Sequence, residues 1–415
     1  MLAALESGVK GGIWFSLMDK VASKRNLEAA TQQVVANKGG SGVDRVTVTQ
    51  FCARSETEIE KLMADLKAGT YSPQAIRRVM IPKPGSTEKR PLGIPTVRDR
   101  VVQTALLNVL EPIYEKTFAA HSYGFRPNRG CKDALRRVSK LLAAGHTWIV
   151  DADLKSYFDT IPHERLMSLV RERVADGAVL KLIESFLSQP IFEELSEWIP
   201  ETGTPQGAVI SPLLSNLYLN RLDHLMAESG YEMVRYADDF VVLCRSQREA
   251  EEALRTIATW TGEAGLSLHP SKTKIVGLDD KNGFDFLGYH FRRSKKRPDK
   301  INCWPRNKSL LSLREKLRPQ TRRTQGNNLA YIIAKINPIL RGWFEYYKHS
   351  TIRSDFDDIE GWIRGRLRTM LRRRLKRKGI ARGSDHQRWP NAYFATRGLF
   401  SLLAAHASER VPVLS

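Results

Sequence analysis

The spacing of apolar residues predicts helices in the first part of the chain. Residues 1–70 have a mostly helical pattern, interrupted by a Gly-rich break at 38–42. From Thr96 to Ile113 apolar residues recur at helical spacing, which predicts one buried face. Asp99 follows Thr96 by three residues, as in a capping box. We therefore expect this buried helix to begin at Thr96.

The stretches between the helical patterns predict short strands. Four prolines between residues 77 and 100 exclude a helix and favour two strands joined by a turn at Pro84-Gly85. Residues 147–154 form an apolar run interrupted by acids, short enough for a core strand. Residues 231–244 contain two β-rich runs, which predicts a hairpin with Asp238 and Asp239 at its tip. Further short strands are expected at 274–278 and 284–291.

The pattern changes after about residue 300 to helical segments rich in Arg and Lys. A basic, Pro-containing stretch at 292–298 precedes this change and marks a domain boundary. The predicted regions are an N-terminal extension at 1–70, a central domain at 71–295, a C-terminal domain at 296–400 and a tail at 401–415.

The charge balance points to a polyanionic partner. Lys and Arg number 66 against 45 Asp and Glu, a formal charge of +21, and nucleic acid is the commonest partner for so large a surplus. Apolar runs are shorter than the roughly 20 residues of a membrane span, and the start of the chain is a poor signal peptide. We expect no membrane association and a location in the cytoplasm.

The four cysteines lie far apart in the sequence and form no C-x-x-C pair. Neither a zinc knuckle nor a disulfide framework is therefore predicted, and free thiols are expected. Cys52, Cys131, Cys244 and Cys303 make up the set.

Three aspartates at the ends of predicted strands form a candidate metal site. Asp153 ends one strand, and Asp238 and Asp239 lie at the hairpin tip. Crowded carboxylates repel one another, so such a cluster makes sense chiefly around a cation, and Mg²⁺ prefers carboxylate oxygens. Nucleotidyl transfer uses two such cations, one at the attacking 3′-hydroxyl and one at the triphosphate. A solvated Asp-Asp turn is the alternative, and the apolar flanks of the hairpin argue against it.

Six sequence blocks in order give a resemblance to the reverse transcriptases encoded by bacterial group II introns. The chain resembles this family from about residue 35 to about residue 400. The blocks are IPKPGSTEKRPLGIPTVRDRVVQ, SYGFRPNRGCKDAL, VDADLKSYFDTIPH, GTPQGAVISPLLSNLYL, YADD, and GLSLHPSKTKI followed by FLGY. The resemblance implies a mixed α/β right-hand polymerase, with fingers and palm built on an antiparallel sheet and an α-helical thumb.

The resemblance also assigns roles to the acids and to one lysine. Asp153 and Asp238 match the principal metal ligands, and Asp239 matches the third acid. They would hold two Mg²⁺ ions, with Mn²⁺ as a substitute. Lys272 matches the residue that protonates the departing pyrophosphate, and a purely electrostatic role is the alternative.

Residues for the incoming nucleotide follow from the same blocks. Phe158 matches a steric gate that leaves no room for a 2′-hydroxyl, with an ordinary core Phe as the alternative. Lys83 and Arg90 would neutralise the triphosphate, and a solvated loop charge is the alternative for each. Gln206 would touch template and nucleotide, and Gly207 would let the backbone approach closely.

The last two groups of residues concern the primer and the RNA. The primer grip would comprise Phe286, Leu287, Gly288 and Tyr289, although an apolar β-hairpin has the same pattern. The segments after residue 309 resemble the thumb, or maturase, region, and the basic residues between 364 and 378 are too dense for a soluble face alone. Arg364, Arg372, Arg373, Arg374 and Lys376 are the predicted RNA-binding residues. Most aromatic residues of this region are expected in the helix core.

The resemblance implies an RNA-directed DNA polymerase that uses an RNA template, a DNA or RNA primer and dNTPs. Group II intron RNA is the expected partner, with assisted splicing and retrohoming as the setting. No module with paired cysteines follows residue 400, as in the compact subgroup that lacks the endonuclease domain. Two alternatives are a host-adapted enzyme of DNA repair or phage defence, and an RNA-binding maturase with a vestigial polymerase. The oligomeric state is not predicted.

Overall fold

The computed structural model describes residues 11–82, 89–193, 196–280 and 283–409. The chain divides into two compact units, which are described separately. The first unit draws on Met1–Ala134, Val150–Val242 and Arg248–Lys274. The second draws on Leu135–Ile149, Leu243–Gln247 and Ile275–Ser415. The domain boundaries predicted from the sequence, which give regions at 1–70, 71–295, 296–400 and 401–415, stay a prediction.

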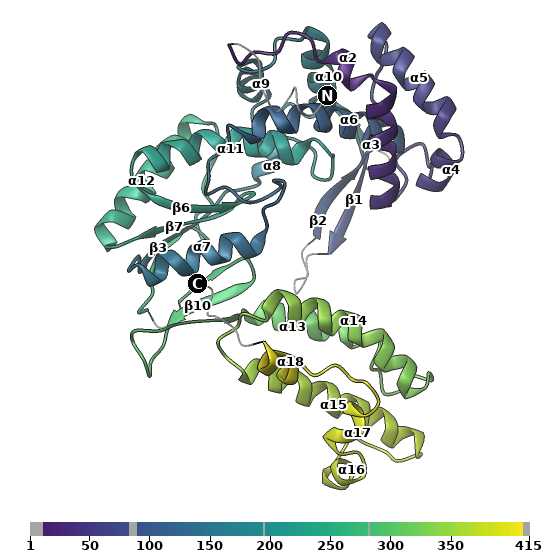
Figure 1. Ribbon diagram of the computed structural model, residues 1–415, viewed down its shortest axis with the longest axis vertical. Helices are drawn as coiled ribbons and strands as arrows, with labels where there is room; N and C mark the ends of the chain where they lie inside the picture. Colours follow the sequence, from purple (N-terminus) through teal and green to yellow (C-terminus); the bar gives the residue numbers. More distant parts are fainter. Residues whose placement is uncertain (1–10, 83–88, 194–195, 281–282, 410–415) are drawn as a thin grey trace. The chain divides into compact units, whose positions relative to one another are not determined.

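Helices that are close in sequence pack together at the start of the first unit (Figure 1). They are α2 (Met18–Val21), α3 (Lys24–Asn37), α4 (Val48–Cys52), α5 (Ser55–Ala68) and α6 (Val97–Glu115). Thr96 caps α6 as predicted, because its Oγ1 accepts a hydrogen bond from the Asp99 backbone N at 3.1 Å. The Asp99 carboxylate instead accepts a hydrogen bond from Tyr71 Oη at 2.6 Å, so Asp99 ties α6 to the chain that follows α5.

A four-stranded sheet of the order β2-β1-β4-β5 follows these helices. Its strands are β1 (Ile76–Pro82), β2 (Lys89–Ile94), β4 (Ile191–Glu193) and β5 (Ser196–Trp198). β1 and β2 are antiparallel, with Arg77 opposite Ile94 and Pro82 opposite Lys89. The two strands predicted within 77–100 are therefore confirmed, and the predicted turn at Pro84-Gly85 lies outside the described residues.

A second four-stranded sheet has the order β6-β7-β3-β8 and carries the three predicted acids. Its strands are β3 (Trp148–Asp153), β6 (Glu232–Tyr236), β7 (Asp239–Cys244) and β8 (Lys274–Gly277). The helices α11 (Ser211–Glu228) and α12 (Gln247–Glu263) run beside β6 and β7 (Figure 1). The remaining helices before β6 are α7 (Cys131–Ala143), α8 (Tyr157–Thr160), α9 (His163–Arg171) and α10 (Gly177–Leu187).

The second unit combines a small sheet with a helical core. Its sheet has the order β11-β10-β9, formed by β9 (Phe284–Phe286), β10 (Tyr289–Arg293) and β11 (Ile301–Pro305). Its described helices after β11 are α13 (Asn307–Leu317), α14 (Leu329–Tyr347), α15 (Ser354–Arg374), α16 (Gly383–Arg388), α17 (Asn391–Ala395) and α18 (Leu402–Ser408). Phe356, Leu367 and Phe394 are wholly buried between them. As predicted, Trp389 and Tyr347 lie in the interior of the unit and are 7% and 8% exposed.

The mixed α/β class, with antiparallel strand pairs and a separate helical C-terminal part, is confirmed. All four cysteines are free thiols. In the part of the chain that the structure describes, no helix has both the length and the apolar character to cross a membrane.

Candidate active site

Asp153 and Asp238 lie close enough to act on each other electrostatically. Asp153 is the last residue of β3, and Asp238 lies in the two-residue turn between β6 and β7. Burial raises the pKa of the Asp238 carboxyl, and the charge of Asp153 raises it further. The fold thus brings together two acids that are 85 positions apart in the sequence. Asp239 is the exposed first residue of β7.

Lys272 pairs with Asp153 in the same site. Its Nζ lies 2.9 Å from Asp153 Oδ2, in a pair that is about half exposed. The segment that carries Lys272 is tied to β3, because the His269 backbone N donates to the Asp153 carbonyl oxygen at 2.7 Å. Lys274 Nζ lies 3.6 Å from Asp151 Oδ2, so Asp151 has a partner of its own. The charge of Lys272 partly offsets the repulsion between the two acids and lowers the pKa of Asp238.

The donor atoms fit a divalent cation that also binds a substrate. Among the residues described, no group of three or more His, Cys, Asp or Glu stands close enough to hold a metal alone. Asp153 and Asp238 supply only oxygen donors, which suit Mg²⁺, and this ion commonly completes its shell with water and substrate phosphates. Burial is the main cause of the raised pKa of the Asp238 carboxyl and the charge of Asp153 adds to it, so a bound cation would favour the ionised form.

Phe158 and Gln206 line one pocket of about 490 Å³ in the first unit. The Phe158 side chain is half-buried, with its ring 5.5 Å from the Tyr157 ring. Its backbone is fixed, because the Thr204 backbone N donates to the Phe158 carbonyl oxygen at 2.6 Å. The pocket is therefore lined by the residue predicted to exclude the 2′-hydroxyl and by the residue predicted to contact template and nucleotide.

Gly207 permits a close backbone approach, although the neighbour seen here is protein. Its φ is +105°, and a Cβ would lie 2.3 Å from the Gly93 carbonyl oxygen of β2. The Gly93 backbone N in turn donates to the Gln206 carbonyl oxygen at 2.6 Å. These contacts join the Gln206 loop to the strand that carries Arg90. Arg90 itself is exposed near the start of β2, and Lys83 lies outside the described residues.

The predicted primer grip is a hairpin tip attached to α14 in the second unit. Phe286 and Tyr289 are each 1% exposed, so their rings are structural, and Leu287 with Gly288 forms the tip. Tyr346 Oη donates to the Leu287 carbonyl oxygen at 2.7 Å. A Cβ at Gly288 would lie 2.6 Å from Tyr347 Oη. Contact with a primer would therefore come from the backbone and side chain of the tip.

The predicted RNA-binding residues divide into two groups. Arg364 is paired with Glu360, and Arg372 Nη1 lies 2.8 Å from Asp385 Oδ2. Arg374 is exposed, but its guanidinium donates to the Asn327 carbonyl oxygen. Arg373 and Lys376 are exposed, as are Arg377 and Lys378 next to them. The first group stabilises the helices, and the exposed group is accessible to a polyanion.

Two residues beside the site were absent from the sequence-based prediction. Phe125 is 48% exposed with φ +56°, and its ring lies 6.5 Å from the ring of Tyr236. Arg235 is wholly buried in β6 directly before Tyr236. A charged residue inside an otherwise apolar strand was the signal that could have identified Arg235, because Arg is almost never buried without a partner.

Comparison with known proteins agrees with this geometry. The family described as reverse transcriptase (RNA-dependent DNA polymerase) matches residues 81–291, and the group II intron, maturase-specific domain matches residues 310–389. Protein YkfC of Escherichia coli K12 is 37% identical over 317 residues, which cover 65% of this chain and 81% of YkfC. The group II intron-encoded protein LtrA of Lactococcus lactis subsp. cremoris is 40% identical over 201 residues, 48% of this chain.

The matched region spans only 33% of LtrA. Among solved structures, a chain of a partial Cas6-RT-Cas1--Cas2 complex is 20% identical with a TM-score of 0.38, over 60% of this chain and 42% of that one.

Proposed function

This chain belongs to the reverse transcriptase family and carries a group II intron maturase-specific domain, and from this premise we propose that it extends a primer with dNTPs on an RNA template by two-metal nucleotidyl transfer. We further propose that it binds a group II intron RNA to assist splicing and retrohoming. The observation that carries the proposal is the electrostatic coupling of Asp153 and Asp238, with Lys272 paired to Asp153.

The acids would hold the metal. Asp153, Asp238 and Asp239 would bind two Mg²⁺ ions. Bound there, the ions would activate the 3′-hydroxyl and neutralise the charge of the phosphates. The proximity of the Asp153 and Asp238 carboxyl groups, each acting on the other electrostatically, supports this role. Mn²⁺ would substitute, because its oxygen ligands are the same.

The other residues would bind and orient the substrates. Phe158 would exclude the 2′-hydroxyl, and Gln206 would contact template and nucleotide from the same pocket. Arg90 and Lys83 would pair with phosphate oxygens. Lys272 would hold a proton at Nζ for the departing pyrophosphate, once a cation has taken its place beside Asp153.

The deciding experiment compares Asp153→Asn and Asp238→Asn with the wild type on a primed RNA template. Each change removes a metal-ligand charge but leaves the basic surface intact. DNA synthesis should fall by roughly three orders of magnitude, because a catalytic metal contributes several kcal/mol of charge stabilisation. RNA binding should change by less than about twofold.

Asp65→Asn is the matched control, because it removes one carboxylate charge from α5, where Asp65 pairs with Arg98. It should leave synthesis near the wild-type rate. Synthesis within about tenfold of wild type in either active-site variant would contradict the proposed site.

A further inference from the structure

A wholly buried guanidinium lies under the turn that carries Asp238. Arg235 and Asp223 both have 0% exposed side chains. Arg235 Nε donates to Asp223 Oδ1 at 2.7 Å, and Nη2 donates to Asp223 Oδ2. Burial of a charge is costly unless it is paired and hydrogen-bonded, and this bidentate pair from α11 provides both. One edge of the guanidinium is therefore fixed to α11.

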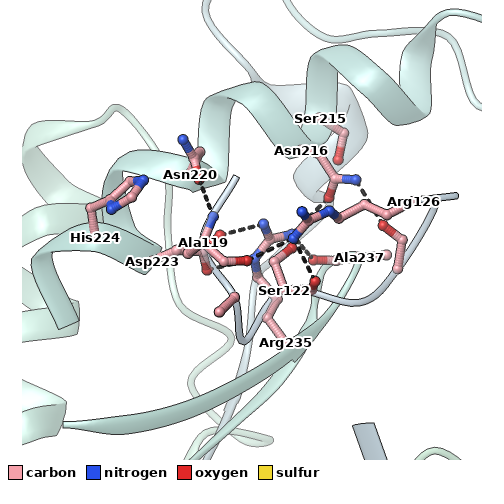
Figure 2. A network of polar contacts seen from close by, with 12 residues as sticks. Ala119, Ser122, Arg126, Ser215, Asn216, Asn220, Asp223, His224, Arg235 and Ala237 are labelled. Carbon is pink, nitrogen blue, oxygen red and sulfur yellow. Dashed lines mark hydrogen bonds and ion pairs between the residues drawn. The ribbon is translucent and has the colours of Figure 1, made fainter. Parts of the chain in front are cut away.

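The remaining nitrogen of Arg235 points at the turn (Figure 2). Nη1 donates to the Ala237 carbonyl oxygen at 2.8 Å and to Asn216 Oδ1 at 2.9 Å. Asn216 Nδ2 in turn donates to the Gly124 carbonyl oxygen at 2.7 Å. The side chain thus connects α11, the loop that carries Gly124 and the catalytic turn.

The turn itself has an unfavourable backbone conformation. Ala237 has φ +60°, in the left-handed region, which is unfavourable for a residue with a Cβ. Gly124 packs directly against the backbone N of Ala237. A Cβ added at Gly124 would lie 2.2 Å from that atom. Ala237 is therefore held at its carbonyl by Arg235 and confined at its backbone N, in the preceding peptide group, by Gly124.

The loop that carries Gly124 is itself attached to β6. The Arg235 backbone N donates to the His121 carbonyl oxygen at 3.0 Å, and the Tyr123 backbone N donates to the Arg235 carbonyl oxygen at 2.9 Å. Arg126 Nη1 donates to the Ala119 and Ser122 carbonyl oxygens at 2.6 and 2.8 Å. Movement of this loop would therefore change the contact between Gly124 and the turn at Ala237.

We propose that Arg235 is a positioning residue for Asp238: by holding the Ala237 carbonyl, it fixes the peptide plane from which the Asp238 carboxylate projects toward the metal. The inference rests on the proposed function. Because the Ala237 carbonyl and the Asp238 amide belong to one planar peptide group, its orientation, together with φ and χ1 of Asp238, sets the direction of the Asp238 side chain. The same hydrogen bond also satisfies a buried N–H of the guanidinium, so the test has to separate positioning of the turn from stability.

Arg235→Lys is the direct test. Lysine keeps the positive charge, but its single ammonium cannot span both Asp223 oxygens and also reach Asn216 and the Ala237 carbonyl. Hydrogen–deuterium exchange, measured by mass spectrometry, should show faster exchange in the peptide that contains residues 236–240. Mn²⁺ affinity, measured by electron paramagnetic resonance on a complex with dideoxy-terminated primer–template and dNTP, should fall roughly 10- to 100-fold.

Activity gives a third measurement. The Mg²⁺ concentration for half-maximal DNA synthesis should rise by a comparable factor, and affinity for the primer–template should stay within about twofold. Gly124→Ala approaches the same turn without changing any charge. Its Cβ would force the turn to shift, so it should give the same faster exchange and weaker Mn²⁺ binding.

Asp176→Asn is the matched control for stability. Asp176 accepts hydrogen bonds from the Leu17 and Met18 backbone N and from the start of α10, and all of these partners lie outside residues 236–240. It should lower the melting temperature without changing exchange at 236–240 or Mn²⁺ affinity. Equal changes in Asp176→Asn and Arg235→Lys would overturn the inference, because loss of stability would then explain both.

The inference is also overturned if folded Arg235→Lys keeps wild-type exchange and Mn²⁺ affinity. If Arg235→Lys does not fold, Gly124→Ala decides, and wild-type behaviour in that variant overturns the inference. Failure of the proposed function is distinguishable, since the wild type would then make no DNA, whereas the exchange measurement would still report on the turn.

Discussion

At the scale of single residues, Phe158 offers a test of sugar selection. Its backbone is fixed by the hydrogen bond from Thr204, and its half-buried side chain lines the pocket with Gln206. Phe158→Ala should raise incorporation of ribonucleotides relative to deoxynucleotides by at least about tenfold, because the steric exclusion is removed. Single-nucleotide extension with both substrate types measures the ratio.

Tyr157→Phe is the control for this substitution. Tyr157 is buried and donates from Oη to the Ser215 carbonyl oxygen at 2.7 Å. Loss of that hydroxyl should reduce stability and leave the choice of sugar unchanged. An unchanged ratio in a well-folded Phe158→Ala variant would identify Phe158 as a core residue only.

Asp238 should destabilise the metal-free protein at neutral pH. Its pKa is raised by burial and then by Asp153, so folding disfavours the ionised form. A raised pKa stabilises the fold at low pH, and this contribution is lost as the pH rises through the folded-state pKa. Asp238→Asn should therefore raise the melting temperature in EDTA at neutral pH, by roughly 2–4 °C per kcal/mol relieved.

The sign of this effect fixes its pH dependence. As the pH falls toward the ordinary value of 3.8, the wild-type carboxyl becomes protonated and the advantage of Asp238→Asn should disappear. Mg²⁺ should stabilise the wild type more than the variant. Thermal melting across pH, with and without Mg²⁺, provides the measurement, and a lower melting temperature for Asp238→Asn in EDTA would show that the carboxylate does not destabilise the fold.

At the scale of elements, the hairpin of β9 and β10 depends on α14. Gly288 has φ +82° and lies against Tyr347, so Gly288→Ala should displace the tip and strain its backbone. We expect a raised KM for primer–template in steady-state extension, with the KM for dNTP nearly unchanged. Gly361→Ala is the control, since this α15 glycine has open space around it and should gain up to about 1 kcal/mol in helix propensity. Equal KM values in Gly288→Ala and the wild type would argue that the tip does not touch the primer.

Elements with a strong local signal were predicted correctly. The start of α6 at Thr96 follows from a side-chain cap, and the hairpin of β6 and β7 follows from two β-rich runs around Ala237. The placement of Asp153 and Lys272 in one site came from family resemblance alone, because contacts across more than a hundred residues leave no periodic pattern.

The role of Arg235 was not predicted for a related physical reason. Sequence patterns report local backbone preference and burial. The proposed positioning role of Arg235 depends instead on its hydrogen bonds to Asp223 and to the Ala237 carbonyl oxygen. The basic stretch around α15 shows the converse limit. Density of charge suggested one RNA-binding row, but Arg372 and Arg364 have acidic partners that sequence spacing alone did not single out.

At the scale of the whole molecule, a charge of +21 predicts strongly salt-dependent binding to RNA. The exposed residues at the C-terminal end of α15 and directly after it are the best place to test this dependence, because they take no part in the ion pairs of Arg364 and Arg372. The variant changes Arg373, Lys376, Arg377 and Lys378 to Ala. Binding should weaken, and the log–log salt slope should become shallower by roughly 0.7 to 0.9 for each phosphate that the variant no longer neutralises.

A second variant with the same net charge shows whether RNA affinity depends on these particular residues or only on the total positive charge of the protein. It changes four exposed basic residues of α3 and α5 to Ala: Lys24, Arg25, Lys61 and Lys67. Filter binding across a salt series should compare a group II intron RNA with an unrelated duplex for both variants. A maturase loses most with the intron RNA and only in the first variant, whereas a repair-type enzyme loses affinity for both RNAs alike. Equal slopes in the two variants would show that the residues at and directly after the end of α15 contribute only their share of the net charge, and the RNA-binding role proposed for this region would then fail.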